Sequence, residues 1–184
     1  MLQNKYDINW LIQEKNVEYF AFWGHKTRNS GKLTSSCLNQ WWASDFIYEN
    51  EKYWCMEQFM MEQKALMFND VLTWSEIRNC NDQKKIRKLG KKVTMFDEEI
   101  WNERREEILL KGNLAKFLCN ESIKEFLLST ENKVLVEISP YDKVLGVGLN
   151  KNDSRLEDIN AWQGKNLLGF ALMTVRDWIR EETK

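Results

Sequence analysis

A succession of helical segments across residues 54–128 most constrains what this chain can fold into. Apolar residues recur there at helical spacing, and no proline interrupts them, because the only proline is Pro140. Asp97 is the expected N-cap of the fourth segment, Gly112 its stop, and Asn120 the cap of the fifth. The predicted helices cover 54–68, 70–79, 82–92, 97–112 and 120–130.

Strands are expected to be few and short. The β-branched and aromatic stretches predict strands at 17–24 and 133–140, a hairpin over 44–54 that turns at 49–51, and a loop at 25–36. Two further helices are predicted near 7–15 and at 165–182. We therefore expect one compact, mainly α multihelical domain over 1–184, with a minor α+β component of a few short strands.

Charge and cysteine content narrow the function classes. The net charge of −1 gives no overall attraction to nucleic acid. The four cysteines show no CxxC spacing, and His25 is the only histidine, so no metal site is expected. The cysteines are expected to be buried free thiols. The first ten residues lack a signal-peptide pattern and no run is long enough to span a membrane, which predicts a cytosolic protein with no membrane partner.

Glu57 and Lys64 form the first candidate site. In a helix over 54–68 they fall roughly 20° apart in rotation and roughly 10 Å apart in rise, among methionines and aromatic residues. A shared pocket fits this spacing better than a direct salt bridge, and desolvation in it would lower the pKa of Lys64 and make its amine nucleophilic. The alternatives are an ordinary ion pair, or a lysine that extends to solvent.

The segment VEISPYDKVLGVGL, residues 136–149, is the second candidate site. A predicted strand delivers Glu137, and a turn follows with Asp142, Gly146 and Gly148. Carboxylates at strand ends beside glycines are common in active sites, where the glycines allow a close approach to phosphate or ribose. The alternative is a plain loop in which Asp142 only caps a turn.

Two further segments carry candidate binding residues. KGNLAKF, residues 111–117, is expected at a junction between two helices, where Asn113 and exposed amides would receive an anion with help from Lys116. FWGH places Trp23 and Gly24 after a strand, which suits stacking on a base. The alternatives are an ordinary helix–turn–helix joint with an exposed lysine, and core packing. The basic run at 84–92 is interpreted as a solvated helix face.

Taken together, these segments resemble the YbiA-like N-glycosidase family, also known as the NADAR (NAD and ADP-ribose) family. The resemblance covers roughly residues 20–176 in collinear order. It is carried by FWGH, CLNQWW, MEQFMMEQKALMF, LGKKVTMFDEEIWNERREEILLKGNLAKF, LVEISPYDKVLGVGL and WQGKNLLGFALMTVR. The chain departs from the family pattern at Gln58, where a histidine is usual, and at Leu145, where a tryptophan is often found.

The resemblance implies a compact, mostly helical fold and cleavage of the N-glycosidic bond between a ribose and a base, without a cofactor. One branch hydrolyses phosphoribosylamino-pyrimidine intermediates of riboflavin synthesis and releases ribose 5-phosphate, and another removes ADP-ribose from guanine in nucleic acid. The near-zero charge and the CLNQWW and FWGH forms favour the first. A silent module that binds NAD or ADP-ribose stays open. The expected catalytic residues are Glu57, Lys64 and Asp142, and the expected substrate-binding residues are Trp23, Gly24, Trp42, Trp54, Asn113, Lys116, Glu137, Gly146 and Gly148.

Overall fold

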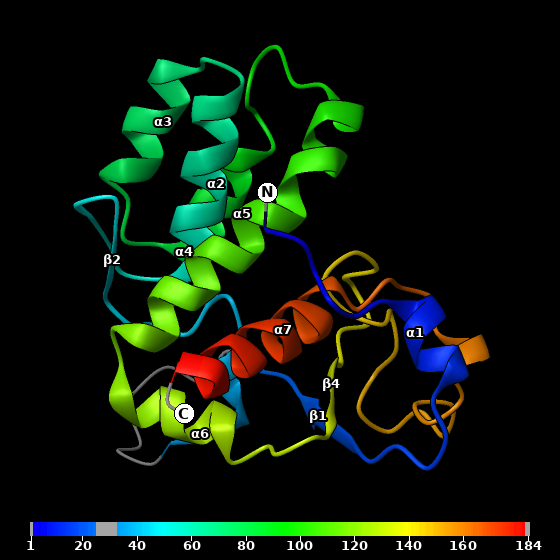
Figure 1. The fold of residues 1–184 in the computed structure, drawn as a ribbon. Helices are drawn as coiled ribbons and strands as arrows, with labels where there is room; N and C mark the ends of the chain where they lie inside the picture. Colours follow the sequence, from blue (N-terminus) through cyan, green and yellow to red (C-terminus); the bar gives the residue numbers. More distant parts are fainter. Residues whose placement is uncertain (1, 25–32, 183–184) are drawn as a thin grey trace.

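The computed structural model describes residues 2–24 and 33–182, which fold into helices around two small sheets (Figure 1). The sheets are β1 (Tyr19–Phe22) with β4 (Val134–Glu137), and the hairpin of β2 (Phe46–Tyr48) and β3 (Glu51–Tyr53). Short 3₁₀ turns are η1 (Ser35–Leu38) and η2 (Ile159–Ala161). The helices are α1 (Ile8–Gln13), α2 (Met56–Met67), α3 (Val71–Arg78), α4 (Gln83–Gly90), α5 (Glu98–Leu118), α6 (Glu121–Leu128) and α7 (Leu167–Glu182).

Helices α2 to α5 pack together as one part of the molecule, drawn at the top of Figure 1. Three of these four helices begin at an aspartate, because Asp70, Asp82 and Asp97 each accept hydrogen bonds from first-turn amides. A small apolar cluster that includes Ala65 and Ile77 fills the space between α2, α3 and α4. Helix α2 is therefore enclosed by its neighbours, and its polar side chains must find partners inside the fold.

The second part is built on the parallel pairing of β1 with β4. Strand β4 is buried along its whole length, and Phe22 lies opposite Glu137 in the register. Helix α7 packs on β4 so closely that a Cβ on Gly169 would lie 2.0 Å from the backbone oxygen of Leu135. The helix runs between the two sheet strands and the upper helices in Figure 1. This packing fixes the end of β4, where Glu137 lies.

The structure confirms the mainly helical fold and the predicted order of helices and strands. The hairpin turns at Glu49 and Asn50, both of which have positive φ. Most of the predicted loop at 25–36, with His25, lies outside the described residues. Among residues 2–24 and 33–182, no helix is long and apolar enough to cross a membrane. Three cysteines are buried as expected, but Cys119 is exposed.

The predicted stop at Gly112 is wrong, because α5 continues through this residue to Leu118. Glycine is needed here for close packing: a Cβ on Gly112 would lie 2.5 Å from the Phe59 ring and 2.7 Å from Cε of Met56. The absence of a side chain therefore lets α2 approach α5. The predicted start at Trp54 is also too early, since Cys55 is the N-cap of α2.

Replacing Gly112 by alanine is expected to destabilise the protein by up to about 2 kcal/mol. Helix propensity alone favours alanine by about 1 kcal/mol, but overpacking against an aromatic ring costs typically 1–3 kcal/mol and occasionally more. Urea denaturation measures the difference. Asn102→Ala, at an exposed position of the same helix, is the matched control, and an equal gain in both variants would show that the contact with Phe59 is soft.

Candidate active site

One cavity of about 320 Å³ gathers the residues with the most unusual environments. Segments far apart in the sequence form its wall. Helix α2 contributes Glu57, Met61 and Lys64; the end of α4 contributes Arg87, Gly90 and Lys91; the segment after η1 contributes Asn39, Gln40 and Trp41; β4 and the following loop contribute Glu137, Ser139, Tyr141, Asp142 and Leu145; and Trp23 follows β1. We call this cavity the carboxylate pocket.

Glu57 lies in the first turn of α2 and is buried in the pocket wall. The Trp41 indole donates a hydrogen bond to its carboxylate, and its backbone amide donates to the carbonyl oxygen of Gln40 at 3.1 Å. Burial raises the pKa of Glu57 to about 7, with a smaller contribution from the charge of Asp142. A carboxyl group with this pKa can hold or release a proton at neutral pH.

Glu137 is the second buried carboxyl group, at the end of β4. Its Oε1 accepts from Nδ2 of Asn39 at 3.3 Å, and its backbone amide donates to Oδ1 of Asn166. Burial, together with the smaller effect of the negative charges of Asp142 and Glu57, raises its pKa to about 8. The surroundings of both glutamates therefore favour their protonated forms over the ionised ones.

Arg87 and Asp142 complete the charged group. Nη2 of Arg87 lies 3.9 Å from Oδ2 of Asp142, and the arginine charge lowers the pKa of both buried glutamates. Oδ1 of Asp142 also accepts from the amides of Val144 and Leu145, so this residue does cap a turn as well as line the pocket. No three metal-ligand side chains in the described part of the chain come together to hold an ion.

Lys64 lies two helical turns beyond Glu57 and reaches the same pocket, as the spacing predicted. Its Nζ donates to the carbonyl oxygen of Gly90 at 2.8 Å and lies 3.9 Å from the centre of the Phe96 ring. Within residues 2–24 and 33–182, no carboxylate lies at ion-pair distance from this amine. Partial burial lowers the pKa of Lys64, which increases the fraction of neutral, nucleophilic amine.

Asn113 and Lys116 do not hold an anion at a helix junction, because both lie fully buried inside α5. Nδ2 of Asn113 bonds within its own helix, to the Leu109 carbonyl oxygen. Nζ of Lys116 donates to the carbonyl oxygens of Cys37 and Asn39 at 2.7 and 3.1 Å. Lys116 therefore fixes the segment that carries the pocket residues instead of contacting a ligand.

Several predicted binding residues lie outside the pocket wall. Trp42 is buried in the main core, and the indole of Trp54 donates to the Cys80 carbonyl oxygen. Gly146 and Gly148 shape the loop after β4: a Cβ on Gly146 would lie 2.8 Å from the Glu137 carbonyl oxygen, and Gly148 has a φ of +72°. Gly24 has a φ of +117°, a backbone conformation that favours glycine. Of the predicted stacking residues, the pocket contains only Trp23, which is 46% exposed.

Sequence reasoning missed Gln40, Trp41 and Arg87. The first two lie within CLNQWW, where the adjacent Trp42 was predicted to be the substrate-binding residue. Arg87 lies in a run of basic residues that is typical of a solvated helix face. One signal was available: helical spacing places Arg87 on the same side of α4 as the buried Gly90.

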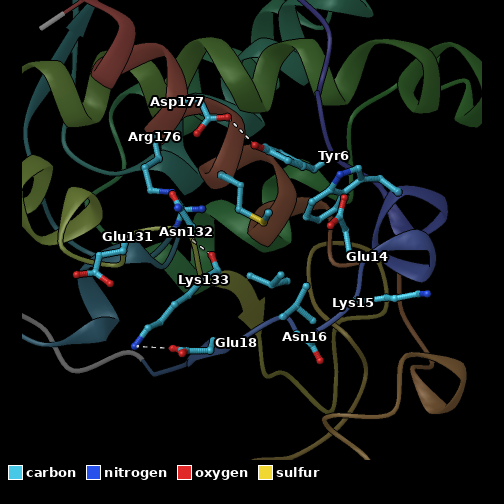
Figure 2. A pocket seen from close by; sticks show the side chains of 14 residues that line it. Tyr6, Glu14, Lys15, Asn16, Glu18, Glu131, Asn132, Lys133, Arg176 and Asp177 are labelled. Atoms are coloured by element: carbon cyan, nitrogen blue, oxygen red, sulfur yellow. Dashed lines mark hydrogen bonds and ion pairs between the residues drawn. The ribbon is translucent and has the colours of Figure 1, made fainter. Parts of the chain in front are cut away.

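A larger cavity of about 480 Å³ lies between the N-terminal segment, the start of β4 and α7 (Figure 2). Several of its polar side chains form contacts that hold the fold together. Tyr6 donates to Asp177 at 2.6 Å, Nζ of Lys133 lies 3.3 Å from Glu18, and Arg176 donates to the Thr130 hydroxyl and the Lys133 carbonyl oxygen. These contacts join α7 to the edge of the sheet, so the carboxylate pocket is the better candidate active site.

The fold and the pocket together define a class: a small, mainly helical domain with paired buried carboxyl groups and a desolvated lysine in one cavity. The sequence profile of the NADAR domain matches residues 21–180. The chain therefore belongs to the NADAR domain family, as the resemblance predicted.

Relatives and a solved structure agree with this assignment. The chain is 36% identical to N-glycosidase R617 of Acanthamoeba polyphaga mimivirus over 87% of this chain and 95% of that protein. It is 31% identical to N-glycosidase Npun_R5314 of Nostoc punctiforme over 73% of this chain and 80% of that protein. The NMR structure of E. coli YbiA superposes with a TM-score of 0.73 at 20% identity, over 92% of this chain and 89% of that chain, which supports the fold.

Proposed function

We propose that this chain is an N-glycosidase that hydrolyses the bond between a ribose and its base. The preferred substrate is a phosphoribosylamino-pyrimidine of the riboflavin pathway, and the products are ribose 5-phosphate and the free base. The family assignment and the names of the relatives support an activity on N-glycosyl bonds. The observation that carries the proposal is the presence of Lys64 and two carboxyl groups of raised pKa, Glu57 and Glu137, in one cavity.

The first step of the proposed mechanism is attack by the neutral amine of Lys64 on C1 of the ribose. The bond between C1 and the base nitrogen breaks, its electron pair leaves with the base, and the base takes a proton from Glu57. The raised pKa of Glu57 suits this task because the group keeps its proton to a higher pH than an ordinary glutamate does. Asp142, at the pocket edge, then stabilises positive charge near C1.

The second step releases the sugar from the lysine. The attached nitrogen, which became positively charged on attack, gives one of its two protons to the ring oxygen; the bond between C1 and that oxygen breaks, and the freed electron pair of the nitrogen forms a protonated imine with C1. Glu57, now ionised, takes a proton from water as the water adds to C1, and collapse of this adduct frees the lysine and the ribose 5-phosphate. One water is consumed in each turnover, and every group returns to its starting protonation state.

The pocket rim offers groups for the rest of the substrate. Trp23 and Tyr141 are exposed aromatic rings that can stack on a flat base. Arg87 and Lys91 supply positive charge for a phosphate in place of the buried Lys116. An ADP-ribosylated guanine would use the same stacking and charge, and so remains the second candidate substrate class.

Product analysis by mass spectrometry tests the proposal. Purified protein is incubated with a phosphoribosylamino-pyrimidine and, separately, with an ADP-ribosylated guanosine oligonucleotide. Ribose 5-phosphate from the first is the expected result. ADP-ribose from the second alone would move the protein to the other substrate class. A ligand-induced rise in the melting temperature without any free base would indicate a binding module.

Arg87→Met is expected to move the alkaline limb of the pH–activity profile to higher pH. Arg87 lowers the pKa of Glu57 and of Glu137, so its removal lets both carboxyl groups keep their protons at higher pH. If Glu57 acts as the acid, activity falls as pH rises through its pKa, and in the variant this fall occurs at a higher pH. Profiles of kcat/KM from pH 5 to 10 measure the shift. Arg155→Met, at an exposed position, should leave the profile unchanged.

A further inference from the structure

Gln40 has a side-chain amide that the fold buries and does not use. The residue is 3% exposed and lines the carboxylate pocket. Neither its Nε2 nor its Oε1 has a hydrogen-bond partner within residues 2–24 and 33–182. Leaving a buried polar atom unpaired destabilises the folded state, and most such atoms in folded proteins have partners.

Three other buried amides of the fold, those of Asn39, Asn166 and Gln58, use both of their side-chain polar atoms. Asn39 donates to Glu137 and accepts from the amide of Trp41. Asn166 accepts from the Glu137 amide and donates to the Leu135 carbonyl oxygen. Gln58 likewise uses both of its polar atoms. Gln40 differs from all three, so its side-chain amide is available to form hydrogen bonds with a bound ligand.

The place of Gln40 indicates where that partner lies. Its backbone oxygen accepts from the amide of Glu57, so its backbone adjoins the residue proposed to protonate the leaving base. Oε2 of Glu137, in the same pocket, is also buried without a partner in the described chain. A base attached to C1 next to Glu57 and Lys64 would bring its polar edge to these unpaired atoms.

A carboxamide presents one N–H donor and one C=O acceptor side by side. Its complement is a carbonyl with an adjacent N–H, which is the lactam edge of a pyrimidinone ring. We propose that Gln40 is a specificity-determining residue that selects the leaving base by pairing with such an edge. This inference rests on the proposed N-glycosidase function. It adds that Gln40 determines substrate specificity and that the lactam edge of the base is the group it recognises.

Equilibrium binding tests this pairing without requiring turnover. The probes are 2,4-diamino-6-hydroxypyrimidine, which has the lactam edge, and 2,4-diamino-6-methoxypyrimidine, in which O-methylation removes it. Titration calorimetry compares wild type with Gln40→Met, which keeps the length of the side chain but removes both polar atoms. Wild type should bind the hydroxy compound 10–100-fold more tightly than the methoxy compound, at about 1.4 kcal/mol per tenfold. The variant should lose this preference.

The melting temperature of Gln40→Met distinguishes a residue that recognises the ligand from one that supports the fold. Removing two unpaired polar atoms should leave the melting temperature of Gln40→Met unchanged or higher, whereas an amide that supports the fold would lower it. Gln13→Met, at an exposed position of α1, is the matched control and should bind both probes as wild type does.

The outcomes distinguish this inference from the proposed function. No preference in wild type, or the same preference in the variant, overturns the role of Gln40 even if ribose 5-phosphate is released. A preference that depends on Gln40 in a protein that cleaves neither substrate would support base recognition by Gln40 and reject hydrolysis.

Discussion

Lys64→Met is expected to lower the rate of base release at least about 1,000-fold, because covalent catalysis is lost together with its nucleophile. Methionine is close to lysine in length and suits the apolar wall around Phe96 and Trp101, so the variant should fold. Lys64→Arg should be equally inactive, since a guanidinium keeps the charge but does not lose its proton near neutral pH. An active arginine variant would show that Lys64 acts only as a positive charge.

Borohydride reduction during turnover identifies the proposed imine directly. Wild type incubated with substrate and borohydride should gain the mass of the reduced sugar on the peptide that contains Lys64. The methionine variant should gain nothing. Lys88→Met, which removes an exposed lysine of α4 outside the pocket, is the matched control and should keep both the activity and the adduct. Full activity without an adduct would remove the nucleophilic role.

Glu137→Gln is expected to stabilise the protein at pH 8, because glutamine replaces a buried group that ionises as pH rises towards this value. The pKa of Glu137 is raised from 4.5 to about 8 in the folded protein. As pH rises between these values, the unfolded chain releases its proton before the folded chain does, so wild-type stability falls across this window and the contribution is lost above pH 8. The full shift corresponds to about 5 kcal/mol as an upper bound, and we expect a gain of about 2–4 kcal/mol.

Urea denaturation at pH 5 and pH 8 measures this effect. The difference between variant and wild type should be small at pH 5 and large at pH 8, because glutamine does not titrate and its oxygen still accepts from Asn39. Glu125→Gln, on the exposed side of α6, should show no such pH dependence. Equal stability of the Glu137 variant and wild type at both pH values would mean that the pocket solvates the charge.

Local sequence patterns predicted the elements whose packing agrees with their periodicity. The order of helices and the two strands that pair as β1 and β4 followed from apolar spacing and β-branched runs. Gly112 was misread because a glycine at a helix end and a glycine at a close helix contact have the same local signature. Only the ring of Phe59, 53 residues earlier in the chain, distinguishes the two cases.

The candidate site was predictable where it lies on one element. Glu57 and Lys64 share a helix, so a rotation of about 100° per residue was enough to place them together. Gln40 and Arg87 come from other segments, and no periodicity relates them to α2. Trp42 was preferred over Trp41 because aromatic composition does not show which of two adjacent side chains faces a cavity.

The pairing of β1 with β4 has a consequence for how the protein becomes active during synthesis. Tyr19 pairs with Val134, so this contact closes a loop of more than a hundred residues, and such contacts form late in folding. Glu137 is then held by Asn166, which leaves the ribosome later still. Upper helices such as α2 and α5 can assemble on the nascent chain, but the carboxylate pocket is complete only once the last helix has begun to emerge, so incomplete chains are expected to have no activity.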